Sequence, residues 1–226
     1  MSAHGPRQLA LALDHAESLA PEDFLAGPSN AAALALIESY PDWPARAAVL
    51  VGPEGSGKSH LAAIWAGEAG ARLLGARSLG ETHLPAALAT GALVVEDIAP
   101  GDFDERALFH LLNLAREEQA HLLLTGRTLP AGWDISIRDL ESRLKALPVV
   151  ALAAPDDALL RAVLVKLFAD RQLLVDESLV GYVATRMERS FAAASAMVER
   201  LDQEAMRLQR PLTRALAAEI LRTREP

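Results

Sequence analysis

Residues 52–59 read Gly52-Pro53-Glu54-Gly55-Ser56-Gly57-Lys58-Ser59, which matches the phosphate-binding pattern G-x-x-x-x-G-K-[ST] at every fixed position. The unbroken apolar run at 47–51 predicts a central strand of a parallel sheet. Apolar residues at helical spacing after the motif predict a helix. Glycines let backbone N–H groups close around phosphate oxygens, and the helix adds the positive end of its dipole. We therefore interpret the stretch as a P-loop that binds a nucleotide.

Two side chains of this loop have separate expected roles. Lys58 supplies a positive charge to the terminal phosphates, and Ser59 offers its hydroxyl to a magnesium ion. All eight residues of the motif are candidate nucleotide-binding residues.

A second landmark is Ala92-Leu93-Val94-Val95-Glu96-Asp97, four apolar residues followed by two acids. We interpret it as a Walker B motif, whose acids lie at the carboxyl end of a strand where open α/β sheets bind ligands. One carboxylate can hold magnesium through water while the other orients the attacking water. Glu96 and Asp97 are thus candidate catalytic residues, and Glu96 joins Ser59 as a candidate metal ligand. An acidic pair in this position can also be a solvated helix cap.

The rest of the first 154 residues predicts alternating helices and strands. A helix running to about Tyr40 begins after Ser29 or Asn30, either of which can cap it. We expect a strand near 72–76, a short helix after Pro85, a long helix over 103–118, and strands at 121–125 and 147–152. The strand at 121–125 should lie between the first two, where either Thr125 or Arg127 could sense the terminal phosphate.

After Pro155 the pattern predicts helices only, at about 156–172, 176–187, 190–209 and 212–224. The fold class is α/β, a P-loop NTPase with a parallel sheet flanked by helices and then a small all-helical lid. We expect a flexible segment at 1–19, a nucleotide-binding domain at 20–154 and the lid at 155–226.

Composition narrows the classes of partner. The chain has no cysteine and a formal net charge of −8, all of it in residues 1–154, because residues 155–226 hold equal numbers of acidic and basic residues. Neither part has the excess of Lys and Arg that duplex binding requires, so we expect no direct sequence-specific DNA binding. No run approaches the ~20 apolar residues of a membrane helix. We expect a cytoplasmic protein without a membrane partner.

Taken together, the motifs in this order resemble those of an AAA+ ATPase. The closer resemblance is to the Hda-like group of the DnaA branch, regulators that inactivate the replication initiator DnaA. It covers nearly the whole chain and is carried by Phe24 with Gly27-Pro28-Ser29-Asn30, by Gly57-Lys58-Ser59-His60-Leu61, and by Asp139-Leu140-Glu141-Ser142-Arg143-Leu144.

The resemblance implies ligands and partners. It implies ADP or ATP with Mg²⁺ as cofactors, with Phe24, Asn30 and His60 joining the P-loop in nucleotide binding. It implies a DNA polymerase sliding clamp (the beta subunit) and DnaA as partners, and it leaves a homo-oligomer possible. The hexapeptide at 8–13 matches the clamp-docking motif of such proteins, with Gln8, Leu9, Leu11 and Leu13 as the candidate contacts. From its composition alone, this hexapeptide is better explained as an edge strand or a fragment packed on the core, and the resemblance favours docking.

Arg143 matches the position from which these regulators present an arginine to ATP held by DnaA. From sequence alone it could instead be a helix-surface residue in an i,i+4 pair with Asp139. Three positions depart from the resemblance: Ala192 at the usual lid arginine, Arg127 where an acid is frequent, and Glu96 where aspartate is usual. We therefore expect weak intrinsic ATPase and bound ADP. The alternative function is an autonomous AAA+ ATPase, such as a helicase loader or remodelling factor.

Overall fold

The computed structural model describes residues 19–80 and 83–222. It divides into two compact units, one from Leu19 to Leu159 and the other beginning at Leu160. The predicted clamp-docking residues 8–13 lie outside the described residues. No helix in the described parts of the chain is both long and apolar enough to cross a membrane.

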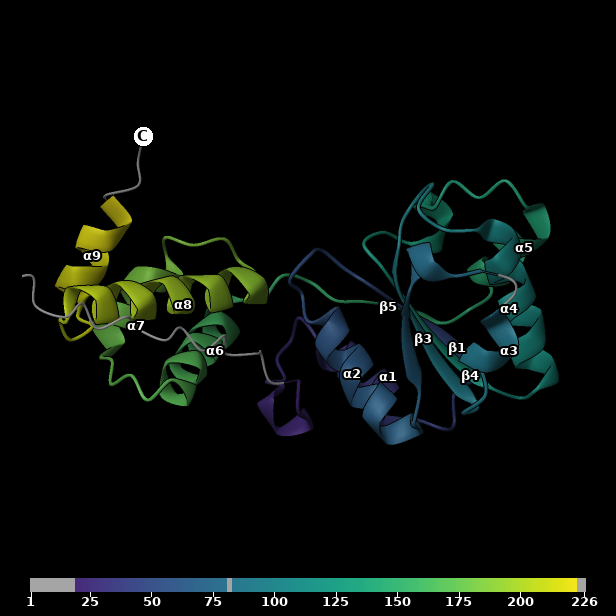
Figure 1. Cartoon of the computed structure of the whole chain (residues 1–226), viewed down its shortest axis with the longest axis horizontal. Coiled ribbons are helices and arrows are strands. Elements are labelled where there is room, and N and C mark those ends of the chain that lie inside the picture. Colours follow the sequence, from purple (N-terminus) through teal and green to yellow (C-terminus); the bar gives the residue numbers. More distant parts are fainter. Residues whose placement is uncertain (1–18, 81–82, 223–226) are drawn as a thin grey trace, which may run out of the picture. The chain divides into compact units, whose positions relative to one another are not determined.

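The first unit is built on a five-stranded parallel sheet in the order β2-β3-β4-β1-β5. Figure 1 shows this sheet between two layers of helices. Because β4 lies between β3 and β1, the carboxyl ends of these three strands meet at one edge, as the sequence predicts. The strands are β1 (Ala47–Val51), β2 (Arg72–Gly75), β3 (Ala92–Ile98), β4 (His121–Gly126) and β5 (Val149–Ala151).

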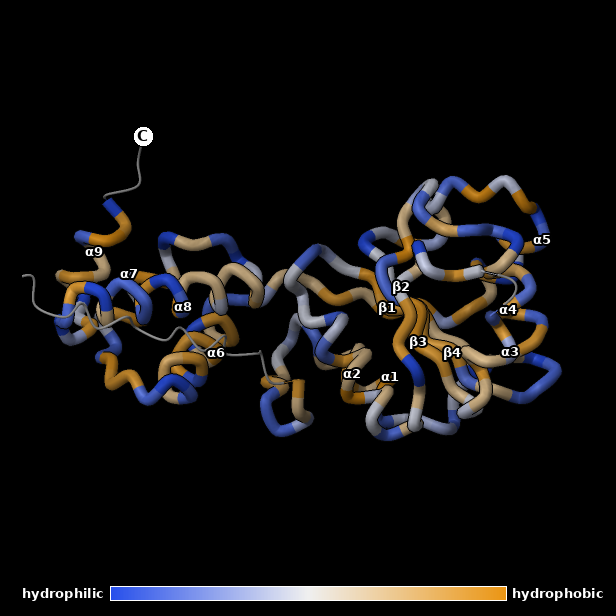
Figure 2. The backbone as a smooth tube through the Cα atoms, in the orientation of Figure 1, coloured by the Kyte–Doolittle hydropathy of each residue, from blue (hydrophilic) through white to orange (hydrophobic). Residues whose placement is uncertain are grey.

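Helices cover both faces of the sheet, which is why the central strands are apolar without alternation. The bounds are α1 (Ala31–Glu38), α2 (Lys58–Ala69), α3 (Leu84–Ala87), α4 (Glu105–Glu117) and α5 (Arg138–Lys145), with 3₁₀ turns at Pro21–Asp23, Ala76–Ser78 and Pro130–Gly132. Successive side chains of β1 point to opposite faces: Val49 packs in the cluster that includes α3, α4 and α5, and Leu50 in the cluster with α1 and α2. The strands form the most hydrophobic part of this unit (Figure 2).

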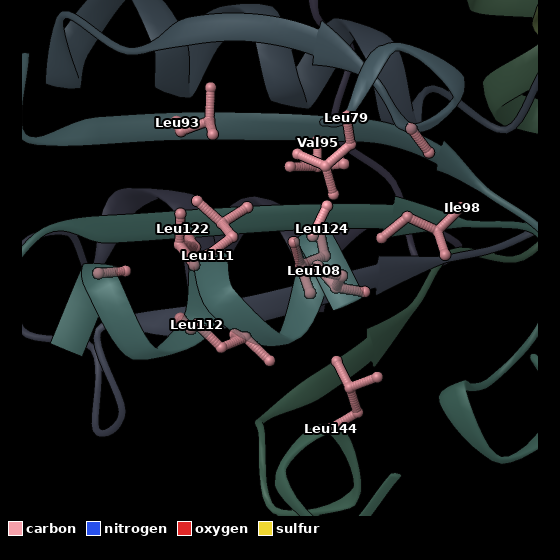
Figure 3. Close-up of a cluster of buried hydrophobic side chains, with 14 of the residues drawn as sticks. Leu79, Leu93, Val95, Ile98, Leu108, Leu111, Leu112, Leu122, Leu124 and Leu144 are labelled. Atoms are coloured by element: carbon pink, nitrogen blue, oxygen red, sulfur yellow. The ribbon is translucent and has the colours of Figure 1, made fainter. Parts of the chain in front are cut away.

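The α4 face shows how the long helix holds to the sheet. Leu108 and Leu111 point from α4 toward Leu122 and Leu124 of β4, and all four side chains are buried (Figure 3). Truncating one such leucine to alanine typically costs about 2–5 kcal/mol. α4 begins where the Asp104 carboxylate accepts hydrogen bonds from the backbone N–H groups of Arg106 and Ala107.

The start of α1 differs from the prediction in one detail. Asn30 occupies the N-cap position, but its side chain makes no capping bond to the helix. Its Oδ1 instead accepts from the N–H of Gly27, and its Nδ2 donates to the carbonyl of Leu25. The preceding turn takes up the side chain because Asn30 is buried and its polar atoms need partners there.

The second unit is all-helical, as the sequence predicts. It contains α6 (Asp157–Asp170, which begins in the first unit), α7 (Glu177–Ala184), α8 (Phe191–Leu208) and α9 (Arg214–Arg222). Asp176 caps α7 and Ser190 caps α8, each by accepting a hydrogen bond from a backbone N–H. The unit has its own core, which includes Leu164, Phe168 and Leu201.

Candidate functional site

The predicted P-loop connects β1 directly to α2. A Cβ on Gly52 would lie 2.6 Å from the carbonyl oxygen of Leu152, so only glycine fits where the loop leaves the sheet. Gly57 stands at the N-cap of α2 with φ of 95°, a conformation that L side chains rarely adopt. These two glycines fix the loop at both ends, and α2 begins with Lys58 directly after it.

Lys58 is buried within its own loop. Its Nζ donates to the carbonyl oxygens of Gly52 at 2.9 Å and Pro53 at 2.8 Å. An ammonium has three donors, so these contacts leave one for an oxygen of a bound phosphate. Burial lowers the pKa of Lys58, and the nearby carboxylate of Asp97 partly offsets that effect.

The acids at the end of β3 lie in different environments. Glu96 is half-buried, and its Oε1 is buried without a hydrogen-bond partner. Asp97 is exposed and adopts φ of 58°, at a break in register between Val95 and Ile98. The irregular backbone therefore turns two consecutive acids into one sheltered and one open carboxylate.

These residues fit a hydrated magnesium ion, which proteins usually bind through one or two carboxylates together with substrate phosphates. The orphaned Glu96 Oε1 is an oxygen that lacks a partner. Ser59, in the first turn of α2, is exposed. Ser59 and Glu96 would hold the ion, which would neutralise phosphate charge when bound.

The two sensing candidates on β4 have different contacts. Thr125 is buried, and its Oγ1 accepts a hydrogen bond from the backbone N–H of Asp97 at 3.1 Å. Arg127 is exposed, and its guanidinium forms an ion pair with Glu54 of the P-loop at 2.9 Å. Thr125 thus positions the main chain of an acid, whereas Arg127 directs a charge at the P-loop itself.

The three residues that the resemblance adds to the P-loop in nucleotide binding have contacts within the first unit. The rings of Phe24 and His60 meet edge-on at 5.3 Å, and His60 Nε2 lies 3.0 Å from the carbonyl oxygen of Ala20. Asn30 is buried and uses its side-chain amide within the turn at 25–30. Phe24 and His60 therefore hold the start of this unit against α2, while Asn30 shapes the turn before α1.

Arg143 lies on α5 and is held against α4. Its guanidinium donates to the side-chain oxygen of Asn113 and lies over the ring of Phe109, 5.0 Å from the centroid. The alternative expectation of an ion pair with Asp139 is wrong, since Arg143 and Asp139 form no such pair in the described structure. The i,i+4 pair of this helix joins Lys145 to Glu141 instead.

Several of these contacts have no signal in the sequence. Asn113 and Arg143 are 30 positions apart, and Glu54 and Arg127 lie on different loops. The two residues of each pair come together only when the strands and helices of the first unit are assembled. In the second unit, Ala192 is exposed in the first turn of α8 and supplies no charge, as its sequence position implies.

Comparison with solved structures identifies the fold. Domain III of the replication initiation protein DnaA from Thermotoga maritima matches with a TM-score of 0.75, at 18% identity over 91% of this chain and 96% of that chain. The chain has a DnaA-like AAA+ fold. AMPPCP-bound DnaA from Aquifex aeolicus matches with a TM-score of 0.67, at 17% identity over 84% of this chain and 68% of that chain.

The same AAA+ fold extends beyond DnaA. A point mutant of RuvB from Thermotoga maritima matches with a TM-score of 0.65, at 17% identity over 78% of this chain and 61% of that chain. No protein-family model matches this chain, and no curated protein matches it.

Proposed function

We propose that this protein is a DnaA-related AAA+ regulator that binds ADP or ATP with Mg²⁺ and stimulates ATP hydrolysis by DnaA. It docks on the DNA polymerase sliding clamp through residues 8–13 and negatively regulates the initiation of replication. The P-loop with its buried Lys58 and the acids at the end of β3 support nucleotide binding. The likeness to solved DnaA structures supports the choice of this branch.

The observation that carries the regulatory part is the position of Arg143. Its contacts in the described structure are with Asn113 and Phe109 of α4, and none is with the phosphate loop of this chain. An arginine that makes no contact with the chain's own P-loop is suited to contact a nucleotide that a partner binds.

Arg143 would act by charge neutralisation. A planar guanidinium has five N–H donors and binds phosphoryl oxygens in a bidentate manner. Asn113 accepts from only one of its nitrogens, so the other donors can approach a partner's phosphates. The contacts with Asn113 and Phe109 restrict the rotamers of Arg143 before the partner arrives, which lowers the entropy cost of placing the charge.

Lys58 and the two acids would hold this chain's own nucleotide. Lys58 would neutralise charge on the terminal phosphates, and Asp97 would orient water. We expect this hydrolysis to be weak, because Ala192 stands where the resemblance places an arginine. On this proposal, the bound nucleotide serves to keep the protein in its active conformation.

The experiment measures hydrolysis of ATP bound to DnaA, with and without this protein and with and without DNA-loaded clamp. The proposal expects acceleration only when both the protein and the loaded clamp are present. Unchanged hydrolysis under all four conditions would contradict it.

The second candidate function is an autonomous AAA+ ATPase, such as a helicase loader or remodelling factor. Lys58, Ser59 and the unpartnered oxygen of Glu96 favour this candidate, because a protein that hydrolyses its own ATP needs residues that bind phosphate and magnesium. Steady-state turnover by the purified protein separates the two, since an autonomous ATPase hydrolyses ATP without DnaA.

A further inference from the structure

A groove lies between α1 and α2 on the first unit. These two helices pack side by side on one face of the sheet (Figure 1). The groove has a volume of about 570 Å³, and most of its lining is apolar, including Leu34, Ile37, Ala63 and Ile64. Leu19, which also lines it, is 43% exposed. The groove therefore presents apolar surface that another molecule can bury.

Gly67 lines the groove from within α2. A glycine in the interior of a helix makes that helix less stable than an alanine does. Packing inside this chain does not require the glycine, because beyond its own helix a Cβ here would meet no described atom within 4 Å. A residue without a side chain does let another backbone approach closely. Gly67 is thus suited to a partner that packs against α2.

The two charged residues of the lining are both acidic. Glu38 is the last residue of α1, and Glu68 lies in the last turn of α2. Neither last turn contains a basic residue, and among the described residues neither carboxylate forms an ion pair. The carboxyl end of a helix carries partial negative charge, which favours a nearby cation. The groove thus lacks the positive charge that both helix ends favour.

We propose that this groove docks an amphipathic helix of a partner protein, one whose apolar face is flanked by lysine or arginine. The apolar side chains of that helix fill the groove, and its backbone approaches α2 at Gly67. Its basic side chains pair with Glu38 and Glu68 and complement the ends of α1 and α2. This charge complementarity selects a basic helix over an acidic one.

The sheet separates this groove from Arg143. α1 and α2 belong to the hydrophobic cluster on one face, whereas Leu140 and Leu144 of α5 belong to the cluster on the other. A partner helix in the groove therefore leaves Arg143 uncovered. The inference does not depend on the proposed action on DnaA.

The probe for the test is a synthetic helix of leucine, alanine and lysine, with leucines at helical spacing along one face. A second peptide carries glutamate in place of lysine. NMR titration of the full chain, labelled at the methyl groups of leucine and isoleucine, measures the affinity and locates the site. The lysine peptide should shift the signals of Leu34, Ile37 and Ile64, and the glutamate peptide should bind about tenfold more weakly or not at all.

Variants of the groove test each part of the inference. Glu38→Gln together with Glu68→Gln should weaken the lysine peptide by roughly tenfold, because two exposed charge interactions are lost. Gly67→Leu should abolish binding by filling the groove, and the two glutamine changes test the inference even if Gly67→Leu unfolds. The matched control is Glu117→Gln together with Glu118→Gln, which removes two exposed acids at the end of α4 on the other face of the sheet. It should leave the affinity unchanged.

Equal affinity for the two peptides, or equal affinity in the control and in the variant at Glu38 and Glu68, would overturn the inference. Two other occupants would overturn it as well. Groove signals that change with protein concentration would assign the groove to a second copy of this chain. Groove signals that move in the peptide-free variant Gln8→Ala with Leu11→Ala would assign it to the chain's own residues 8–13.

Discussion

At the scale of single residues, Lys58 carries a positive charge in a buried environment that disfavours charge. Burial disfavours its ammonium form, and two backbone carbonyls hold it there. Such a group gains from a nearby anion, because a phosphate restores the interactions lost on desolvation. The buried environment of Lys58 therefore favours the binding of a phosphate group.

Lys58→Ala should abolish ADP binding, because the terminal phosphates lose the cation while the backbone of the loop remains. Calorimetry with ADP measures this, and Lys145→Ala, which removes an exposed lysine of α5, is the matched control. ADP affinity equal to wild type in Lys58→Ala would rule out the site described here.

The lowered pKa of Lys58 also predicts a pH dependence. Phosphate binds the protonated lysine, and the free protein loses that proton below the usual lysine value of about 10.4. ADP affinity should therefore begin to fall with rising pH before ordinary lysines titrate.

At Asp97, an experiment must separate the effect of the backbone conformation from the effect of the side-chain charge. Its φ of 58° strains most residues, but aspartate and asparagine tolerate it. Asp97→Asn should thus keep the local backbone, including the bond from its N–H to Thr125, and remove only the charge. We expect ADP binding to be retained and the intrinsic ATPase to decrease further, which binding and single-turnover assays on the same sample would show. ATPase activity equal to wild type in Asp97→Asn would contradict a catalytic role for this carboxylate.

At the scale of elements, α5 is fastened to α4 at both of its ends. Near its start, the carboxylate of Glu105 accepts from the N–H groups of Ser136 and Ile137 and from the hydroxyl of Ser136. Near its end, Arg143 donates to Asn113. The N-cap residue Ile137 makes no side-chain capping bond, and Glu105 instead holds the two residues that precede the first turn of α5. The orientation of Arg143 depends on both attachments.

Glu105→Ala should destabilise the protein by about 1–2 kcal/mol, a value reduced from that of a buried charged hydrogen bond because the group is partly exposed. Burial raises the pKa of Glu105, but the hydrogen bonds from Ser136 and Ile137 outweigh it, so its pKa lies below the usual range. The difference in unfolding free energy should be complete above the unfolded pKa of about 4.3 and shrink as the pH falls through the lower folded value. Urea unfolding of both proteins across this range tests it, and a constant difference would contradict the assigned contact.

The sequence predicts these elements well where one local pattern determines them. β1, α2 and β3 follow from apolar runs that adjoin glycines or acids, and the parallel sheet follows from the unbroken apolar character of its strands. The contacts of Asn30, Arg127 and Arg143 could not be predicted. Each depends on which segments the folded sheet places side by side, and hydrophobic periodicity carries no information about that.

At the scale of the whole molecule, we propose that the chain combines a nucleotide-binding unit with a clamp-docking peptide at residues 8–13. Gln8→Ala together with Leu11→Ala should remove binding to the sliding clamp, since an extended apolar peptide binds through side chains that enter pockets of its partner. The melting temperature should stay close to wild type. A large fall in melting temperature with clamp binding intact would instead favour the alternative of an edge strand.

The contacts of Arg143 set what its removal costs the protein itself. Arg143→Ala loses one hydrogen bond to Asn113 and one cation–π contact with Phe109, together about 1–2 kcal/mol of unfolding free energy. Asn113→Ala loses the same hydrogen bond but keeps the guanidinium. This pair of variants separates a structural role for Arg143 from a role in catalysis on a partner.

The most direct test is therefore the rate of hydrolysis of DnaA-bound ATP at matched clamp occupancy, with wild-type protein and the variants Arg143→Ala, Arg143→Lys and Asn113→Ala. A finger supplied in trans contributes on the order of 10³–10⁵ in rate where the rest of the site is poised, and less in a slow partner. We expect Arg143→Ala to abolish the acceleration, Arg143→Lys to restore little of it because an ammonium lacks paired donors, and Asn113→Ala to retain most of it. Indistinguishable rates for wild type, Arg143→Ala and Arg143→Lys would contradict the assignment of Arg143 and the regulatory function that depends on it.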